Sequence, residues 1–129
     1  MVLSHEDKDT ANSHPYWYGR IIGVFHCQVR HIGPQSKSTE IQRIDFLWVR
    51  WFGRDMEFQA GWKKRRLHRL GFLCEDDDGP IGFLDPNEII RGVHLIPAFA
   101  HGKDTTHTRP SCLHQDDNDW LLYYVNMYL

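Results

Sequence analysis

Residues 43–52, Arg-Ile-Asp-Phe-Leu-Trp-Val-Arg-Trp-Phe, form the densest run of aromatic and β-branched side chains in the chain. Such a run is typical of a β-strand, in which successive side chains point to opposite faces of the sheet. Large apolar side chains fall on both faces, because Leu47 and Val49 alternate with Phe46 and Trp48. A strand that is apolar on both faces is covered on both sides. This favours a small closed or strongly coiled barrel over an open sheet.

A long hairpin is expected to contain this central strand. The loop between the two strands should be residues 31–40, where Gly33 and Pro34 precede a polar run that is typical of a turn. A short helical turn is expected near residues 86–91, because Asp85 can cap a helix whose first residue is a proline. The expected strands are residues 16–30, 43–52, 70–74, 93–97 and 120–129, with irregular segments at 56–62 and 98–119.

The chain of 129 residues is long enough for one hydrophobic core and too short for two. Residues 1–15 form an arm of mixed polarity without apolar periodicity. Such an arm should become ordered only against its own domain or a neighbouring copy. Residues 16–129 should form a single β domain. The predicted fold is therefore mainly β, a small coiled antiparallel sheet or partly open barrel with long loops.

Charge and cysteine content limit the compartment and the partners. The chain has 15 Lys and Arg against 17 Asp and Glu, so it has no global attraction toward nucleic acid or an anionic membrane. Cys27, Cys74 and Cys112 cannot all pair, and the first residues lack the pattern of a signal peptide. No apolar window approaches the roughly 18 residues that span a bilayer. We therefore expect an intracellular protein that is neither secreted nor bound to a membrane.

Three segments occur in the order expected of a bromo-adjacent homology (BAH) domain. They are Gly-Arg-Ile-Ile-Gly-Val-Phe at 19–25, Val-Arg-Trp-Phe-Gly-Arg-Asp at 49–55, and Pro-Asn-Glu-Ile-Ile followed by Val-His-Leu-Ile-Pro within 86–97. The chain resembles that family. The resemblance implies a β-rich barrel and a nuclear, chromatin partner, either a histone tail or a nucleosome. Residues 51–55 and 91–99 are also similar to domains that recur in basidiomycete fungal proteins, a likeness that implies no function.

The resemblance further implies that a methylated lysine could be held in a cage of aromatic rings, whose negative faces attract the ammonium group. Carried over by position, the cage candidates are Tyr16 or Tyr18 in the first strand and Trp51 at the end of the central strand. Gly53 and Asp55 stand where the family carries an aromatic residue and a proline. The alternative is that Tyr18 and Trp51 are ordinary core aromatics.

The most basic run of the chain follows the central strand. It could contact phosphates or the acidic surface of a nucleosome, with Trp62 or His68 stacking beside it. The alternative is a solvated edge strand whose charges prevent aggregation. The residues of this predicted basic patch are Lys63, Lys64, Arg65, Arg66 and Arg69.

The sequence gives no signature of catalysis or of a bound metal. Glycine-rich phosphate loops and nucleophile elbows are absent, and the acidic runs at 75–78 and 116–119 are typical of solvated loops. We therefore expect no enzyme activity, no cofactor and no small-molecule substrate. The residues that crowd the region after 93 lack the paired spacing of a structural zinc site. They are His94, His101, His107, Cys112 and His114.

Two functions from different classes remain open. The first is a non-catalytic interaction module that reads histones or nucleosomes. The second is a self-associating structural protein, a homo-oligomer, tube or filament, in which the arm and the tyrosine-rich last strand pair with neighbouring copies. The residues expected to mediate this contact are Val2 and Leu3 of the arm and Trp120, Tyr123, Tyr124 and Tyr128 of the last strand.

Overall fold

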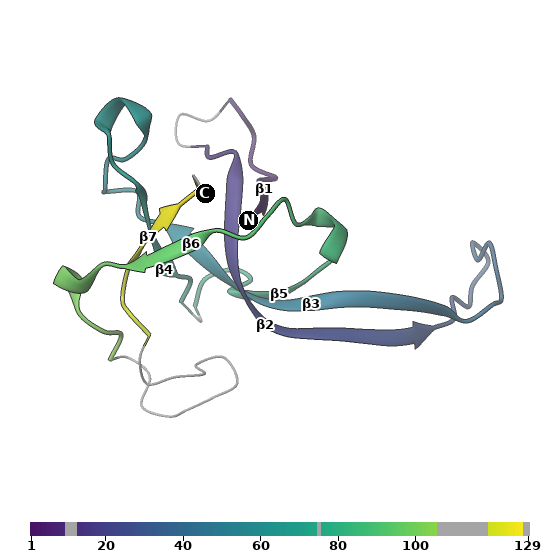
Figure 1. Cartoon of the computed structure of the whole chain (residues 1–129). Coiled ribbons are helices and arrows are strands. Elements are labelled where there is room, and N and C mark those ends of the chain that lie inside the picture. Colours follow the sequence, from purple (N-terminus) through teal and green to yellow (C-terminus); the bar gives the residue numbers. More distant parts are fainter. Residues whose placement is uncertain (10–12, 75, 106–118, 128–129) are drawn as a thin grey trace.

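A computed structural model describes residues 1–9, 13–74, 76–105 and 119–127. Within these ranges seven strands form one antiparallel sheet that curls into an open half-barrel (Figure 1). The predicted fold class is thereby confirmed. The strands are β1 (Val2–Leu3), β2 (Tyr16–Val29), β3 (Gln42–Arg54), β4 (His68–Phe72), β5 (Ile81–Leu84), β6 (His94–Pro97) and β7 (Tyr123–Asn126).

The predicted central strand, β3, occupies the centre of the sheet. The strand order is β1-β2-β3-β4-β7-β6, and β5 also pairs with β3. One edge of β3 pairs with β2 along almost its whole length. Its other edge is shared, since residues 47–50 pair with β5 and residues 52–54 pair with β4. The long hairpin predicted from the sequence is therefore the frame on which the other strands assemble.

The far half of this hairpin projects away from the half-barrel (Figure 1). The β2–β3 ladder runs from the Tyr18–Phe52 pair to the Val29–Gln42 pair, whereas β5 ends opposite Leu47. The ladder changes register at a β-bulge between Ile21 and Gly23. Bulges increase strand twist and bend the strand. The bulge therefore lies where the hairpin leaves the half-barrel.

The hydrophobic core lies at the other end of the hairpin, between β2, β3, β4 and β7. Leu70 is 0% exposed and packs with Tyr18, Phe52, Tyr123 and Val125. The Phe52 ring also stacks on Phe72, with the ring centroids 4.2 Å apart. The core is thus built from strands that are far apart in the sequence.

Several predicted strand boundaries were wrong. The strand expected at 70–74 is β4, His68–Phe72, because Arg69 can enter the sheet with its charge neutralised by Asp55. The strand β5 was not predicted, since four residues after an acidic loop give too short a pattern. The last strand is only Tyr123–Asn126 within the described residues. The segment at 93–97 forms β6, close to its predicted position.

The two segments expected to pair with neighbouring copies lie within the protein's own sheet. β7 is hydrogen-bonded to β4 on one side and to β6 on the other, so it has no free edge. In the arm, Val2 pairs with Trp17 and is buried, while Leu3 is exposed. The described start of the arm is thus paired with its own domain, one of the two expectations for the arm. The predicted pairing edge on the last strand was wrong.

The described helical segments are three single 3-10 turns, η1 (Trp62–Lys64), η2 (Pro86–Glu88) and η3 (Phe99–His101). η2 is the predicted helical turn, and its predicted cap is confirmed, because the Asp85 side chain accepts a hydrogen bond from the Asn87 backbone N–H at 2.9 Å. None of these helical segments has the length and apolar character needed to cross a membrane.

Candidate functional site

The three predicted cage residues border one cavity of about 350 Å³ at the base of the hairpin. Tyr16 and Tyr18 reach it from β2, and Trp51 reaches it from β3. Trp17, which was not predicted, borders the same cavity. We call this cavity the aromatic cavity.

Trp17 and Trp51 supply two of its walls. Their ring centroids are 6.1 Å apart and their planes are inclined at 67°, so the rings meet edge to face. The backbone of Trp51 is fixed on both sides, since its N–H donates to the Pro80 carbonyl at 2.8 Å and its carbonyl accepts from the Leu73 N–H at 3.1 Å. Trp17 is fixed by its pairing with β1. Both indoles are therefore held by several elements of the sheet.

Glycines on the neighbouring strands make room for the Trp51 ring. A Cβ atom built on Gly19 in β2 would lie 3.1 Å from Trp51 Cε3, and one on Gly82 in β5 would lie 3.0 Å from Trp51 Nε1. Both distances are shorter than ordinary van der Waals contact. The ring thus extends across positions on both sides of β3 that carry no side chain.

Two carboxylates border the aromatic cavity, those of Glu6 and Asp78. Glu6 Oε1 accepts a hydrogen bond from Trp17 Nε1 at 3.2 Å, and its Oε2 accepts one from the His14 backbone N–H at 3.2 Å. The Trp17 bond first, and then the His14 bond, lower the pKa of Glu6. Arg54 also borders the cavity, so two carboxylates face one guanidinium.

Tyr18 differs from the other cage candidates because its side chain belongs to the core. It is buried, and its hydroxyl donates a hydrogen bond to Met127 Sδ at 2.8 Å. The alternative reading as a core aromatic therefore holds for Tyr18. Tyr16 is half-buried and also packs against the core, whereas Trp51 is half-buried and packs beside Trp17.

Most of the predicted basic patch lies in a turn at one corner of the molecule. We call residues 62–66 the basic turn, which consists of η1 followed by Arg65 and Arg66. Arg65 has a φ of 52°, which makes it the one non-glycine residue in the left-handed region among those described. Such a conformation costs about 1–3 kcal/mol and is concentrated at functional sites. The alternative prediction, an edge strand, was wrong for Lys63, Lys64 and Arg65, because they lie in η1 and at its end.

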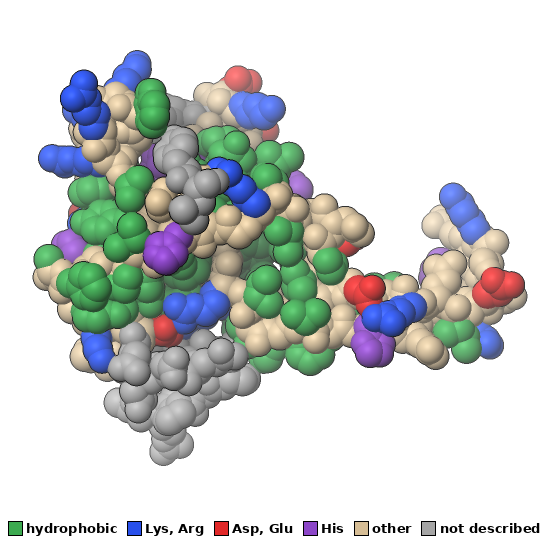
Figure 2. Space-filling view, in the orientation of Figure 1, with side chains coloured by type: hydrophobic (Ala, Val, Ile, Leu, Met, Phe, Trp, Pro, Cys, Tyr) green, Lys and Arg blue, Asp and Glu red, His purple; other side chains and the backbone are tan. Residues whose placement is uncertain are grey.

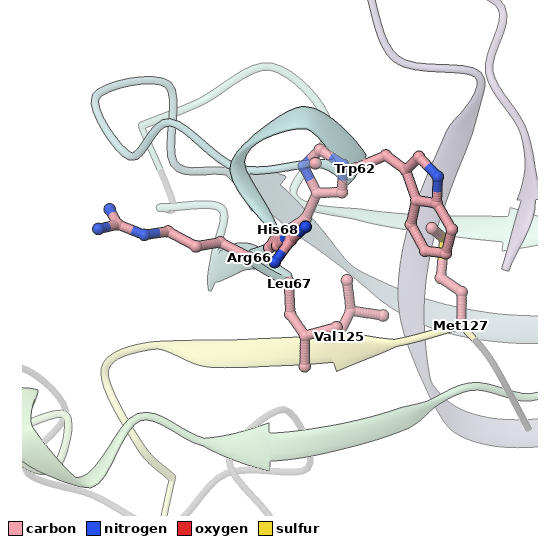
Figure 3. Close-up of a pocket in the computed structure, with 8 residues that line it drawn as sticks. Trp62, Arg66, Leu67, His68, Val125 and Met127 are labelled. Atoms are coloured by element: carbon pink, nitrogen blue, oxygen red, sulfur yellow. The ribbon is translucent and has the colours of Figure 1, made fainter.

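A second cavity of about 550 Å³ lies beneath the basic turn (Figure 3). Trp62 is 82% exposed and extends over the cavity toward Met127, while Leu67 and Val125 line another side. Arg66 is directed toward Phe58, whose ring centroid lies 5.8 Å from its guanidinium carbon. In Figure 2, Lys and Arg side chains gather over this corner. The cavity therefore has apolar walls and a basic rim.

Arg69, the last residue of the predicted patch, is withdrawn from it. Its Nη2 lies 2.6 Å from Asp55 Oδ2, and its guanidinium carbon lies 4.2 Å from the Phe58 ring centroid. Burial favours the neutral form of Asp55, but the hydrogen bond and charge of Arg69 outweigh it and lower the pKa of Asp55. Arg69 thus holds β4 against the loop that follows β3.

A pair of histidines separates the two cavities. His14 borders the aromatic cavity, His68 borders the cavity beneath the basic turn, and their ring centroids are 4.6 Å apart. Burial is the largest cause that lowers the pKa of each ring. His14 Nδ1 lies 3.1 Å from the Tyr16 backbone nitrogen and 3.0 Å from the Tyr16 carbonyl oxygen, and it accepts from the N–H in the neutral tautomer whose Nδ1 carries no proton. The contact between the His14 and His68 rings therefore suits two uncharged imidazoles.

Stability should fall as the pH drops below the ordinary histidine pKa of about 6.5. Both rings have a lower pKa when folded, so the unfolded chain binds protons first and the stability present above pH 6.5 is lost below it. We expect the urea midpoint to be lower at about pH 5.5 than at about pH 7.5. His68→Gln should flatten this dependence, whereas replacing the exposed His26 should not. An equal slope in His68→Gln and the unchanged chain would refute this.

The sequence did not predict a buried ionic cluster around Asp119. Asp119 Oδ1 lies 2.5 Å from Arg20 Nη1, and Asp119 Oδ2 lies 3.5 Å from Arg50 Nη1. The guanidinium of Arg50, whose side chain is 6% exposed, lies 3.8 Å from the Phe72 ring centroid. The solvated loop predicted at 116–119 was therefore wrong for Asp119, and residues 116–118 lie outside the described ranges. The signal available in the sequence was Arg50, a charged residue inside an otherwise apolar predicted strand, which requires a counter-charge when it is buried.

The remaining predicted residues lie apart from both cavities or outside the described ranges. Trp120 packs against Phe99, with ring centroids 4.9 Å apart. The ring centroids of Tyr124 and Phe58 lie 5.9 Å apart. Tyr123 is buried in the core. Among the described residues, no group of three or more His, Cys, Asp and Glu side chains could hold a metal ion. The candidates outside the described ranges are His107, Cys112, His114 and Tyr128.

The three segments that resemble a BAH domain occupy the middle of the fold. Residues 19–25 lie in β2, residues 49–55 lie at the end of β3, and residues 86–97 run from η2 to the end of β6. No protein-family model, curated protein or solved structure matches the chain. The BAH resemblance therefore remains a prediction that rests on these three segments.

Proposed function

We propose that this chain is a non-catalytic interaction module that binds the methylated ammonium group of a lysine on a protein partner, such as a histone tail. One observation carries the proposal. The aromatic cavity is bordered by Trp17 and Trp51, whose rings meet edge to face, and by the carboxylates of Glu6 and Asp78, which outnumber the Arg54 guanidinium there. Aromatic rings beside carboxylates form an environment that favours an organic cation.

The chemistry of a methylated ammonium fits these walls. Methylation keeps the positive charge but replaces N–H donors with methyl groups, which pack against rings without requiring hydrogen bonds. Each ring face attracts such a cation by about 0.5–2 kcal/mol, and tryptophan attracts it best. The lowered pKa of Glu6 keeps a negative charge at the rim at neutral pH. Together these groups favour a methylated lysine over a neutral side chain.

The basic turn supports a nucleosome as the larger partner. It lies beyond the His14–His68 pair from the aromatic cavity, so one ligand could contact both. That ligand would present a cation beside negative charge, as a basic histone tail does where it leaves phosphate-rich DNA. Arg65 and Lys63 could neutralise phosphates there. Because the net charge of the chain is -2, this attraction would be local.

The first test is calorimetric titration with histone peptides that carry trimethylated or unmodified lysines. We expect a methylated peptide to bind more tightly than its unmodified form. Trp51→Ala should weaken that binding at least about tenfold, because a principal ring wall is lost. Trp62→Ala, at an exposed tryptophan in the basic turn, is the matched control and should leave the peptide affinity unchanged.

Measurements of nucleosome binding distinguish the contribution of the basic turn from that of the aromatic cavity. Arg65→Ala should weaken binding to a methylated nucleosome and reduce its salt dependence, with no effect on the isolated peptide. The proposal would be overturned if no methylated peptide bound at high micromolar concentration. It would also be overturned if Trp51→Ala bound methylated and unmodified peptides as the unchanged chain does.

A further inference from the structure

The projecting part of the β2–β3 hairpin has one face without charged side chains. The pairs Phe25–Phe46 and Cys27–Ile44 follow from the register and point to this face, together with Trp48. Phe83 of β5 extends the same face, since it pairs with Trp48. We call this surface the hairpin face. Its residues are Gly23, Phe25, Cys27, Val29, Gln42, Ile44, Phe46, Trp48 and Phe83.

Three phenylalanines form a continuous aromatic row on the hairpin face. Phe25 stacks on Phe46 with ring centroids 5.6 Å apart, and Phe46 meets Phe83 edge to face at 5.4 Å. Despite these contacts, Phe25 is 45% exposed and Phe83 is 73% exposed. Ile44 beside them is exposed as well. Contiguous exposed apolar surface of this kind marks an interaction site.

The far end of the opposite face of the same hairpin is polar. His26 pairs with Asp45 and Gln28 pairs with Arg43, and Arg43 Nε lies 2.9 Å from Asp45 Oδ1. Acidic, basic and histidine side chains follow the near side of the projecting hairpin in Figure 2. A ribbon end that is polar on one face and apolar on the other is typical of a ribbon solvated on one side and covered on the other. The apolar side chains of the hairpin face are therefore suited to pack against another protein layer. No element of the described chain supplies that layer.

The chain exposes more surface than a compact protein of its mass. The chain exposes 9934 Å², whereas a compact protein of 15.3 kDa exposes about 7100 Å². The projecting hairpin contributes to this excess of the whole chain, and a stable interface buries roughly 800 Å² on each partner. No charge on the hairpin face selects a charged partner, and an apolar surface can pack against its own copy about a twofold axis.

We infer that the hairpin face is the interface of a homodimer, in which the hairpins of two copies pack face to face through Phe25, Phe46 and Phe83. This interface replaces the arm and the last strand as the surface for self-association. Trp51 lies on the other face of β3, because it alternates with Trp48 along the strand. Dimerisation therefore leaves the aromatic cavity open, and the inference does not depend on the proposed ligand.

Light scattering over a range of micromolar concentrations tests the dimer. We expect a mass that rises toward twice 15.3 kDa. Phe25→Asp should raise the dissociation constant at least about tenfold, because each copy would bury a carboxylate in an apolar interface. Val24→Asp is the matched control. It places the same charge one residue away, at a side chain that is 73% exposed on the opposite face, and should leave the dimer intact.

Phe83→Asp provides a second variant if Phe25→Asp does not fold, since Phe83 is more exposed and lies on another strand. It should also give monomers with a circular dichroism spectrum like that of the unchanged chain. The inference is overturned if the unchanged chain stays monomeric at every concentration. Equal masses for Phe83→Asp and Val24→Asp, or an assembly larger than two chains, would also overturn it.

Discussion

Asp119→Ala should lower the free energy of unfolding by about 3–5 kcal/mol, which is the usual cost of removing one partner from a buried ion pair. The carboxylate of Asp119 contacts both Arg20 and Arg50. Its loss would leave the Arg50 guanidinium buried against Phe72 without this counter-charge. The expected loss is large because Arg50 cannot reach solvent without disturbing the core strands.

Urea unfolding followed by circular dichroism measures this loss. Asp119→Asn should fall between the alanine variant and the unchanged chain, because its amide oxygen can still accept a hydrogen bond. Arg43→Ala is the control, since the Arg43–Asp45 pair is largely exposed and such pairs contribute at most about 1 kcal/mol. A loss no larger for Asp119→Ala than for Arg43→Ala would show that the buried cluster does not stabilise the fold.

Leu70→Ala should lower the free energy of unfolding by about 2–5 kcal/mol, the range measured for deleting a buried leucine side chain. Leu70 is fully buried in β4, which joins β3 to β7. The cavity would open among Tyr18, Phe52, Tyr123 and Val125. Aromatic rings held by strands on several sides cannot collapse easily into such a space, so we expect a value in the upper half of that range.

Thermal and urea unfolding of Leu70→Ala and Leu121→Ala provide the comparison. Leu121 is 47% exposed, so its truncation removes less buried apolar area and should cost less than about 1 kcal/mol. Similar losses for both variants would mean that the core at β4 is loosely packed. Loss of methyl-lysine binding in Leu70→Ala alone would be interpreted as unfolding rather than as a role in the site.

The sequence predicted the frame of the fold because its strongest patterns are local. The run at 43–52 and the turn residues at 31–40 specify the hairpin, and Asp85 with Pro86 specifies η2. The pattern could not show that only half of the hairpin is covered. Phe46 and Trp48 are apolar in the same alternation as Phe52, yet only Phe52 meets the core.

The aromatic cavity was predicted in part. Tyr16 and Trp51 followed from the family resemblance, but Trp17 did not, because alternation along β2 separates it from both tyrosines. The carboxylate of Glu6 was also missed, since its place at the rim depends on the arm folding back beside β2. Contacts between segments distant in sequence leave no periodic signal. Asp119 illustrates the same limit, because only the fold places it beside Arg20.

The position of β7 between β4 and β6 has a consequence for how the chain folds as it is synthesised. The hairpin can form once residue 54 has left the ribosome, because both of its strands are then available. β6 has no described partner other than β7, and one edge of β4 also waits for that strand. Two strands therefore keep open edges until residues 123–126 emerge, and such edges make the incomplete chain prone to aggregation during that interval.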